Sequence, residues 1–334
     1  MNRGDMEEVK EKGKVCVTGG SGYLGSWMVM RLLQLGYSVN TTIRSHPDRK
    51  KDVSYLTNLQ GAQERLHIYN ADLHKPQSFN TAIEGCIGVF HVAHPIDFEN
   101  KETEETITQR SIDGTIGILL ACLESKTVKR VVYTSSAATV FGGNSNIIDE
   151  SSWTDVDLIR TSKAFASSYT ISKTLTEKTA LEFAEKIGID LVTVIPTWIH
   201  GPFITPQIPD SVRSSMEMIL GHENYTMSYP PNIPFVHVDD VTNAHIFLLE
   251  NSNAKGRYIC SAVEITPEKL AEFLLTRYPE FQKQITEYTW TSREDLKWCS
   301  FSSKRLLETG FKYKYSLEEM FNGAIECCKH RNML

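Results

Sequence analysis

Three features are scarce or missing in the sequence, and each absence argues against a class of protein. No run approaches the roughly 20 consecutive apolar residues that a membrane-spanning helix needs. Lys and Arg number 35 against 41 Asp and Glu, so the net charge of −6 offers no basic excess for nucleic-acid phosphates. No two cysteines have the CxxC spacing of a metal site. We therefore expect no membrane span, no nucleic-acid partner and no metal, and a small molecule as substrate.

Cysteine usage indicates the compartment. The seven cysteines are odd in number and show no disulfide framework: Cys16, Cys86, Cys122, Cys260, Cys299, Cys327 and Cys328. We expect reduced thiols in a cytoplasmic protein. The first fourteen residues, MNRGDMEEVKEKGK, are polar and charged and lack the apolar segment of a signal peptide. The oligomeric state stays open, with a monomer as the working expectation.

Short apolar runs alternate with helical patterns through the first 200 residues. The runs typical of buried strands span 14–18, 38–44, 65–73, 85–93, 129–136 and 188–196. Helical periodicity fills the intervals, notably 26–36, 106–124 and 170–187. This alternation predicts an α/β fold, a doubly wound parallel sheet of the Rossmann type.

The regular alternation of apolar runs and helical patterns ends after Pro196. Prolines concentrate there, and short helical patterns follow at 266–278 and 316–330, which predicts a smaller, irregular substrate-binding domain. One segment, 235–250, again reads as a strand and then a helix, with Asp239 or Asp240 as its N-cap. We expect a nucleotide-binding domain over 13–200 and a substrate domain over 201–334, interleaved because 235–262 returns to the sheet.

A glycine triad follows the first predicted strand directly. Gly19, Gly22 and Gly25 form T-G-x-x-G-x-x-G between a strand and a helix. A tight turn, a close approach to a diphosphate and close helix–strand packing each need a residue without a Cβ. The N-terminus of the following helix supplies unpaired N–H groups for the phosphates. In this position the triad indicates a dinucleotide site, whereas a ligand-free turn is the weaker alternative.

The second strand indicates which dinucleotide binds. An acidic residue that would accept from the ribose 2′-OH of NAD is absent, and the strand ends at Arg44, followed by Arg49, Lys50 and Lys51. A guanidinium suits a 2′-phosphate, so NADP(H) is favoured, although Lys50 and Lys51 also read as a solvated helix start. Asp72, after the third strand, either caps a turn or reaches adenine through its neighbour Leu73.

Tyr169 and Lys173 are four residues apart in a predicted helix and therefore share one face. Alone they would read as a surface pair. However, the fifth strand ends near Ser136, and ligands of a doubly wound sheet lie at the carboxyl ends of its strands. Reduction of a carbonyl needs a proton for the developing alkoxide. We expect Tyr169 to donate it, Lys173 to lower the tyrosine pKa and Ser136 to hold the substrate oxygen.

These motifs together resemble a known family. TGGSGYLG, the YTSS strand end and YTISK are similar to extended short-chain dehydrogenases/reductases. VCVTGGSGYLGSW, KTVKRVVYTSSAATV, IPTWIHGPF and FVHVDDVTNAHIFLLEN resemble the plant dihydroflavonol 4-reductase group, and PIDFE and IPDSV its isoflavonoid branch. The resemblance implies that Ser136, Tyr169 and Lys173 are catalytic, that Lys173 also bonds the nicotinamide ribose, and that Arg44 and Lys51 meet the 2′-phosphate. The expected NADPH-binding residues are Gly19, Gly22, Tyr23, Leu24, Gly25, Arg44, Lys51, Asp72, Leu73, Ala93, Tyr169, Lys173 and Pro196.

Departures from the group bear on the substrate. Phe141 replaces an Asn that bonds flavonoid hydroxyls, Pro234 a Gln and His94 a small polar residue, and Ser111 stands where many relatives have an active-site Asn. The expected substrate contacts are His94, Phe141, Trp198, His200, Phe203, Arg213 and Met216. This set predicts an aromatic-lined pocket for a polycyclic ketone of plant specialised metabolism, an isoflavanone being favoured.

Other functions stay open at this stage. Within the same group the chain is alternatively a dihydroflavonol 4-reductase or an alkaloid reductase/dehydrogenase. A nucleotide-sugar epimerase or dehydratase would favour NAD, against which Arg44 argues. A non-catalytic dinucleotide-binding regulator would not need Ser136, Tyr169 and Lys173 together.

Overall fold

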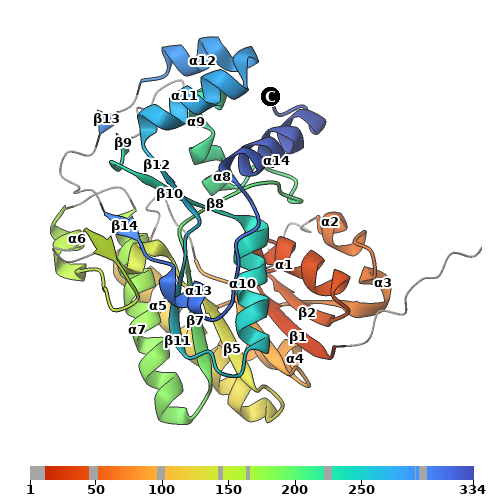
Figure 1. Ribbon diagram of the computed structural model, residues 1–334. Coiled ribbons are helices and arrows are strands. Elements are labelled where there is room, and N and C mark those ends of the chain that lie inside the picture. The colour runs from red at the N-terminus through yellow and green to blue at the C-terminus, as the bar shows by residue number, and fades with distance from the viewer. Residues whose placement is uncertain are drawn as a thin grey trace, which may run out of the picture.

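The computed structural model describes residues 12–44, 52–95, 102–141, 146–162, 166–221, 228–289, 291–292 and 299–334. Within them, a central sheet is flanked by helices, and a smaller lobe lies beyond one end of the sheet (Figure 1). The chain passes from the sheet to the lobe and then returns to the sheet.

The central sheet has seven strands in the order β11-β7-β5-β4-β1-β2-β3, all paired in parallel. Every residue of β5 and β7 is buried, as expected for strands covered on both faces. The predicted doubly wound fold is confirmed, with a seventh strand contributed late in the chain. The strands are β1 (Lys14–Thr18), β2 (Ser38–Ile43), β3 (Leu66–Asn70), β4 (Gly88–His91), β5 (Arg130–Thr134), β7 (Leu191–Pro196) and β11 (Gly256–Cys260).

Helices cover both faces of this sheet (Figure 1). On one face, α1 (Tyr23–Gln34) packs beside α10 (Val238–Glu250). On the other, the long helices α5 (Glu104–Ser125) and α7 (Ser167–Ile187) lie against each other. Short helices complete the connections: α2 (Ser54–Thr57), α3 (Ala62–Arg65), η1 (Pro76–Phe79), α4 (Asn80–Ile83), η2 (Ala137–Thr139) and α6 (Val156–Ser162).

The smaller lobe has its own core, formed around Phe235, Phe321 and Leu270. Its three-stranded sheet has the order β12-β10-β8, and β9 pairs with β13. Its strands are β8 (Trp198–His200), β9 (Ser228–Tyr229), β10 (Ile233–His237), β12 (Val263–Ile265) and β13 (Thr291–Ser292). Its helices are α8 (Asp210–Ser215), α9 (Glu217–Leu220), α11 (Pro267–Arg277), η3 (Pro279–Phe281), α12 (Gln282–Glu287) and α14 (Leu317–His330).

Three short elements from the same part of the chain or close to it pack on the central sheet instead. The pair β6 (Ile147–Ile148) and β14 (Ser300–Phe301) packs beside this sheet, in a cluster with Ile195 of β7 and Ile259 of β11. The short helix α13 (Lys304–Glu308) packs against β11, and its Leu306 belongs to the core of the central sheet.

The start of α10 corrects one prediction. The N-cap is His237, whose ring accepts a hydrogen bond from the N–H of Asp239 at 3.0 Å, and neither aspartate caps the helix. Asp239 instead accepts from the indole of Trp27 at 2.9 Å, and Asp240 accepts from the N–H of Lys314 at 3.0 Å. Both carboxylates lie in the first turn, where the helix dipole favours them, and they join α10 to distant segments.

Arg130 fastens the end of the sheet farthest from the smaller lobe. This buried side chain donates to the carboxylate of Asp190 at 2.7 Å and to the carbonyls of Leu248 at 2.7 Å and Ala254 at 3.1 Å. It thereby connects β5 to the last turn of α10 and to the loop before β11. Ion pairs on the surface contribute less to the free energy of folding than this buried network, because solvent competes with them.

We expect Arg130→Met to lower the free energy of unfolding by about 3–5 kcal/mol, because it leaves several buried acceptors without their donor. Urea unfolding followed by circular dichroism measures this. The control, Arg160→Met, removes an exposed arginine that pairs with Glu104 and should leave the unfolding midpoint unchanged. Equal losses in both variants would contradict this role of Arg130.

Candidate functional site

The glycine loop between β1 and α1 is shaped by two close backbone approaches. Gly19 has φ +72, in the left-handed region that favours glycine. A Cβ on Gly25 would lie 2.3 Å from the carbonyl oxygen of Gly19, and one on Gly20 would lie 1.9 Å from Oγ1 of Thr41. These glycines are therefore required by the protein's own packing.

Gly22 is different. It is the N-cap of α1 in an extended conformation, and a Cβ there would meet only the carbonyl oxygen of Gly19, at 3.5 Å. Nothing in the described protein demands a glycine at this position. The room in front of it, together with the uncapped N–H groups of a twelve-residue helix, fits a diphosphate.

Other predicted cofactor residues surround this loop. Ala93 lies against Gly19, and its N–H is bonded to Oγ1 of Thr18 at 3.0 Å. Tyr23 donates to the carbonyl of Gly201 at 3.1 Å, which holds the smaller lobe against the start of α1. Leu24 is buried beneath the loop, and Pro196 is buried at the end of β7.

The residues expected near the adenosine part of the cofactor differ in what the structure shows of them. Asp72 accepts from the N–H of His74 at 3.0 Å, the turn-forming role that the sequence left open, and Leu73 packs against Gly114 of α5. Arg44 is exposed immediately after β2, where the sequence placed it. Lys51 lies outside the described residues.

The three predicted catalytic residues meet at the carboxyl end of β5. Ser136 caps η2, accepting from the N–H of Ala138 at 3.2 Å, and its hydroxyl is hydrogen bonded to Tyr169. Lys173 is buried one turn further along α7, and its Nζ donates to the carbonyl of Thr134 at 2.8 Å. The structure thus brings together a serine from one segment and a tyrosine–lysine pair from another.

Burial changes the expected ionisation of this trio. The pKa of Tyr169 is raised above its ordinary value, because burial outweighs the opposing effect of its hydrogen bond with Ser136. The sequence predicted a lowered value, so that expectation is corrected. Burial also lowers the pKa of Lys173 to about 7, against the carboxylate of Glu177, which raises it. Tyr169 therefore stays protonated at neutral pH, as a proton donor must.

His94 faces the same tyrosine. Its ring stands edge-on to that of Tyr169, with centroids 5.7 Å apart, and its Nε2 is buried without a hydrogen-bond partner among the described residues. Burial first, then the charge of Lys173, holds the pKa of His94 well below its usual range. A neutral imidazole with one unused nitrogen therefore lies beside Tyr169, and its contact with substrate stays a prediction.

Ser111 does not take the place of an active-site amide. Its hydroxyl donates to the carbonyl of Ile107 at 2.7 Å and is bonded to Ser172 at 3.1 Å, within the buried α5–α7 contact. The residue serves helix packing. Glu177 accepts from Ser135 at 2.5 Å and was not among the predicted site residues, although its spacing of four from Lys173 was an available signal.

The predicted substrate contacts divide into two groups. Phe141 is 40% exposed and stands edge-on to Phe301, while Trp198 is partly buried and donates to the carbonyl of Ser211 at 2.8 Å. Three others are buried in the smaller lobe, where His200 packs against the rings of Phe235 and Phe321. These three are His200, Phe203 and Met216, and their contact with substrate stays a prediction.

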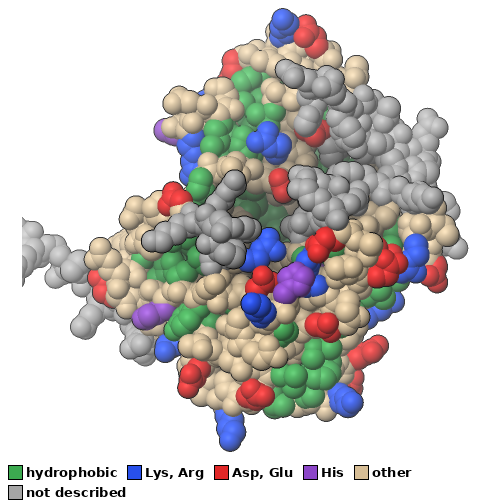
Figure 2. All heavy atoms as spheres, turned by 180° about the vertical axis from the view of Figure 1, so that it is seen from behind, with side chains coloured by type: hydrophobic (Ala, Val, Ile, Leu, Met, Phe, Trp, Pro, Cys, Tyr) green, Lys and Arg blue, Asp and Glu red, His purple; other side chains and the backbone are tan. Residues whose placement is uncertain are grey.

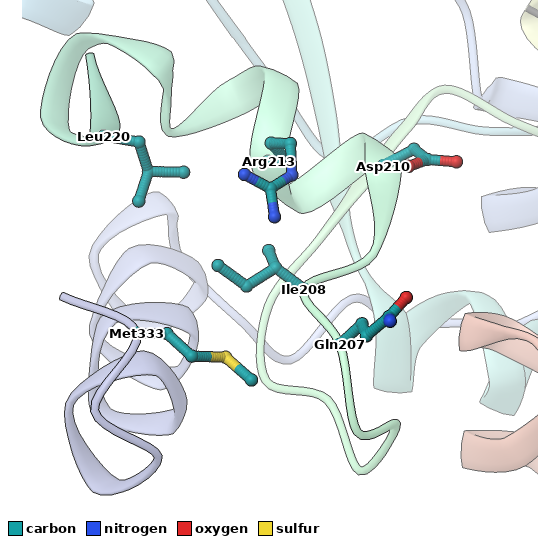
Figure 3. Close-up of a pocket in the computed structure, with 6 residues that line it drawn as sticks. All are labelled: Gln207, Ile208, Asp210, Arg213, Leu220 and Met333. Atoms are coloured by element: carbon teal, nitrogen blue, oxygen red, sulfur yellow. The ribbon is translucent and has the colours of Figure 1, made fainter. Parts of the chain in front are cut away.

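Arg213 lines a separate hollow. This cavity of about 440 Å³ lies between α8, α9 and the end of α14, and Ile208 stands between Arg213 and Met333 (Figure 3). None of the catalytic trio lines it. Seen from behind, the surface is also hollowed between the smaller lobe and the sheet, with charged and histidine side chains gathered on the sheet side (Figure 2).

Comparison with known proteins identifies the family. The model of the NAD dependent epimerase/dehydratase family matches residues 15–260. The chain belongs to this family. It is an oxidoreductase of the extended short-chain dehydrogenase/reductase type and binds a nicotinamide dinucleotide.

Three relatives are similar over nearly their whole length. Vestitone reductase of Medicago sativa is 50% identical, covering 97% of this chain and 99% of its own. Protein BRI1-5 ENHANCED 1 of Arabidopsis thaliana is 50% identical, covering 97% and 90%. A dihydroflavonol 4-reductase of Callistephus chinensis is 46% identical, covering 96% and 87%. The crystal structure of the alfalfa vestitone reductase superposes with a TM-score of 0.84 over 97% of this chain and 100% of that one.

No described helix is both long and apolar enough to cross a membrane. In the same part of the chain, no group of three or more His, Cys, Asp or Glu side chains is placed to hold a metal ion.

We expect Gly22→Ala to weaken binding of a nicotinamide dinucleotide by about tenfold or more, the factor set by roughly 1.4 kcal/mol, because its methyl group occupies the room for the diphosphate. Titration of protein fluorescence with NADPH measures this. Stability should fall by less than about 1 kcal/mol, since only an N-cap glycine is lost. Gly25→Ala is the contrasting variant, because its Cβ clashes with backbone and the fold itself should be destabilised. If Gly22→Ala binds NADPH as tightly as the wild-type protein, the diphosphate does not bind at this loop.

Proposed function

We propose that this protein reduces a ketone of a polycyclic plant metabolite to a secondary alcohol with NADPH, and that an isoflavanone such as vestitone is the favoured substrate. One observation carries the proposal: Ser136, Tyr169 and Lys173 meet at the carboxyl end of β5. They do so in a chain 50% identical to vestitone reductase over nearly its full length. We also propose that the protein acts in the cytoplasm as a monomer.

The proton that completes the reduction of the ketone comes from a side chain of the protein. When bound, the dinucleotide supplies the hydride. The hydroxyl of Ser136 orients the ketone oxygen, and Tyr169, kept protonated by its raised pKa, donates the proton that the developing alkoxide needs. The ammonium of Lys173 then stabilises the tyrosinate left behind. A raised tyrosine pKa suits this reductive direction, because the donor form predominates at neutral pH.

Arg44 supports NADPH over NADH. It stands exposed directly after β2, and no carboxylate occupies the end of that strand. A guanidinium pairs well with a phosphate and has no comparable partner in a 2′-hydroxyl. Turnover with NADPH should therefore exceed turnover with NADH when the two cofactors are compared at equal concentration.

Phe141 supports the choice of an isoflavanone. Its exposed ring follows the turn that Ser136 caps, and it offers stacking without a hydrogen bond. A dihydroflavonol would bury hydroxyls beside it with no partner, which costs about 1–3 kcal/mol for each group. Dihydroflavonol 4-reductase or alkaloid reductase activity is the alternative, and a non-catalytic regulator would show no turnover with any ketone.

We expect Tyr169→Phe to lower kcat by about 10²–10⁴-fold while NADPH affinity is retained, because only the proton donor is lost. Initial rates of NADPH oxidation with vestitone measure this. The matched control is Tyr133→Phe, which removes another buried hydroxyl, one without a hydrogen-bond partner among the described residues, and keeps the ring that lies under Lys173. Tyr133→Phe should turn over normally. Near-normal turnover in Tyr169→Phe would exclude Tyr169 as the donor.

We expect the wild-type protein to have a higher kcat/KM for an isoflavanone than for dihydroquercetin. Phe141→Asn should narrow this gap by about tenfold or more, because an amide donates and accepts where phenyl cannot. Chiral chromatography of the products from a panel of isoflavanones, dihydroflavonols and alkaloid ketones settles which is reduced. A wild-type preference for dihydroquercetin would overturn the isoflavanone assignment, and no turnover with any ketone would overturn the proposed reaction.

A further inference from the structure

A buried ion pair lies directly behind the catalytic trio. Glu177 follows Lys173 by one turn of α7 and is fully enclosed, with an exposed fraction of 0%. Its Oε1 accepts from Nε of Arg257 at 2.9 Å, and its Oε2 accepts from Nη2 of the same guanidinium at 3.3 Å. Arg257 belongs to β11, so the pair joins α7 to the strand at the edge of the sheet.

The same pair holds the turn that carries Ser136. Glu177 accepts from Oγ of Ser135 at 2.5 Å, and Arg257 donates to Oγ1 of Thr139 at 3.2 Å. Thr139 in turn donates to the carbonyl of Ser136 at 3.0 Å. The residues on both sides of Ser136 are therefore bonded to one ion pair, which also stands one turn from Lys173.

Arg257 is itself firmly seated. Its guanidinium lies 3.6 Å from the centre of the Trp153 ring, and its Nη1 donates to the carbonyls of Glu150 at 2.7 Å and Ser152 at 2.8 Å. Both ends of the pair are thus fixed by their surroundings. A guanidinium bonded and stacked in this way has a single orientation in which to meet the carboxylate.

Stability alone does not account for such a pair. Desolvation of two charges offsets much of their attraction, and a well-packed apolar pair of similar volume is often as stable. What an apolar pair could not supply is a negative charge near Lys173 and hydrogen bonds to the residues flanking Ser136. Both of these act on the catalytic groups.

We propose that Glu177 and Arg257 are positioning residues of the reductase, which hold Ser136 in register with Tyr169 and place a carboxylate one helical turn from Lys173. The proposal rests on the proposed function of the trio. It adds two residues that touch neither substrate nor cofactor and act through Ser136 and Lys173.

The charge of Lys173 depends on groups from several elements. Glu177 is the negatively charged partner that raises the pKa of Lys173, whereas burial lowers it to about 7. Without that carboxylate the pKa falls further, so the ammonium is lost at a lower pH. Among the described residues, the other titratable groups near Lys173 are His91 on β4, His94 after it, Tyr133 on β5 and Tyr169 on α7, and Arg257 on β11 pairs with Glu177 itself.

The experiment compares the pH dependence of kcat for vestitone reduction with NADPH in the full-length chain. Activity should fall as the pH rises through the pKa of Lys173, and Glu177→Gln should move this fall to lower pH by about one pH unit. Ser135→Ala removes the hydrogen bond between Glu177 and the residue before Ser136 but keeps the carboxylate of Glu177. We therefore expect kcat to drop by about tenfold with no shift of its pH profile. The double variant Glu177→Gln with Arg257→Met leaves no unpaired buried charge, and its profile should move in the same direction.

The matched control breaks the ion pair at the opposite end of β5. Asp190→Asn removes the partner of Arg130 and should lower the unfolding midpoint without moving the pH profile. The inference is overturned if the pH profile of kcat does not shift in Glu177→Gln or in the double variant, or if Asp190→Asn shifts it equally. The reductase assignment would stand in either case. A wild-type protein that reduces no ketone overturns both.

Discussion

The arrangement of the site depends on one hydrogen bond, from Nζ of Lys173 to the carbonyl of Thr134, 2.8 Å long. It joins the first half of α7 to the carboxyl end of β5. Tyr169 lies one turn before Lys173 on the same helix face, and Ser136 follows Thr134 by two residues, so this contact brings phenol and serine together. His245 holds Thr134 from the opposite face of the sheet, at 2.8 Å.

Burial decides the ionisation of the groups around that contact. The pKa of His91 is lowered to about 3 and that of His245 to about 4, chiefly because both rings are enclosed. Both rings are also fully bonded, His91 to two threonine hydroxyls and His245 to Thr134 and a backbone carbonyl. Lys173 therefore faces a neutral His91 at neutral pH. Desolvation lowers the pKa of Lys173 more than the carboxylate of Glu177 raises it, so this pKa lies below the ordinary value of a lysine.

The smaller lobe is held against the cofactor loop by side chains from both parts. The rings of His237 and Tyr315 are stacked, with centroids 3.8 Å apart, and Tyr315 donates to Asp239 at 3.1 Å. Asp239 also accepts from Trp27 of α1, and Tyr23 at the start of that helix donates to the carbonyl of Gly201. Because α10 and β11 return to the sheet after β10, these contacts lie where the chain crosses between the two parts.

Local patterns in the sequence determined the order of strands and helices, the glycine loop and the pairing of Tyr169 with Lys173, because backbone geometry alone sets periodicity and i,i+4 spacing. The tertiary structure decided what depends on distant segments. Glu177 and Arg257 are 80 residues apart and meet only through the packing of β11 on β7. Likewise, His237 rather than an aspartate caps α10, and burial raises the pKa of Tyr169, because both follow from which neighbours enclose each group.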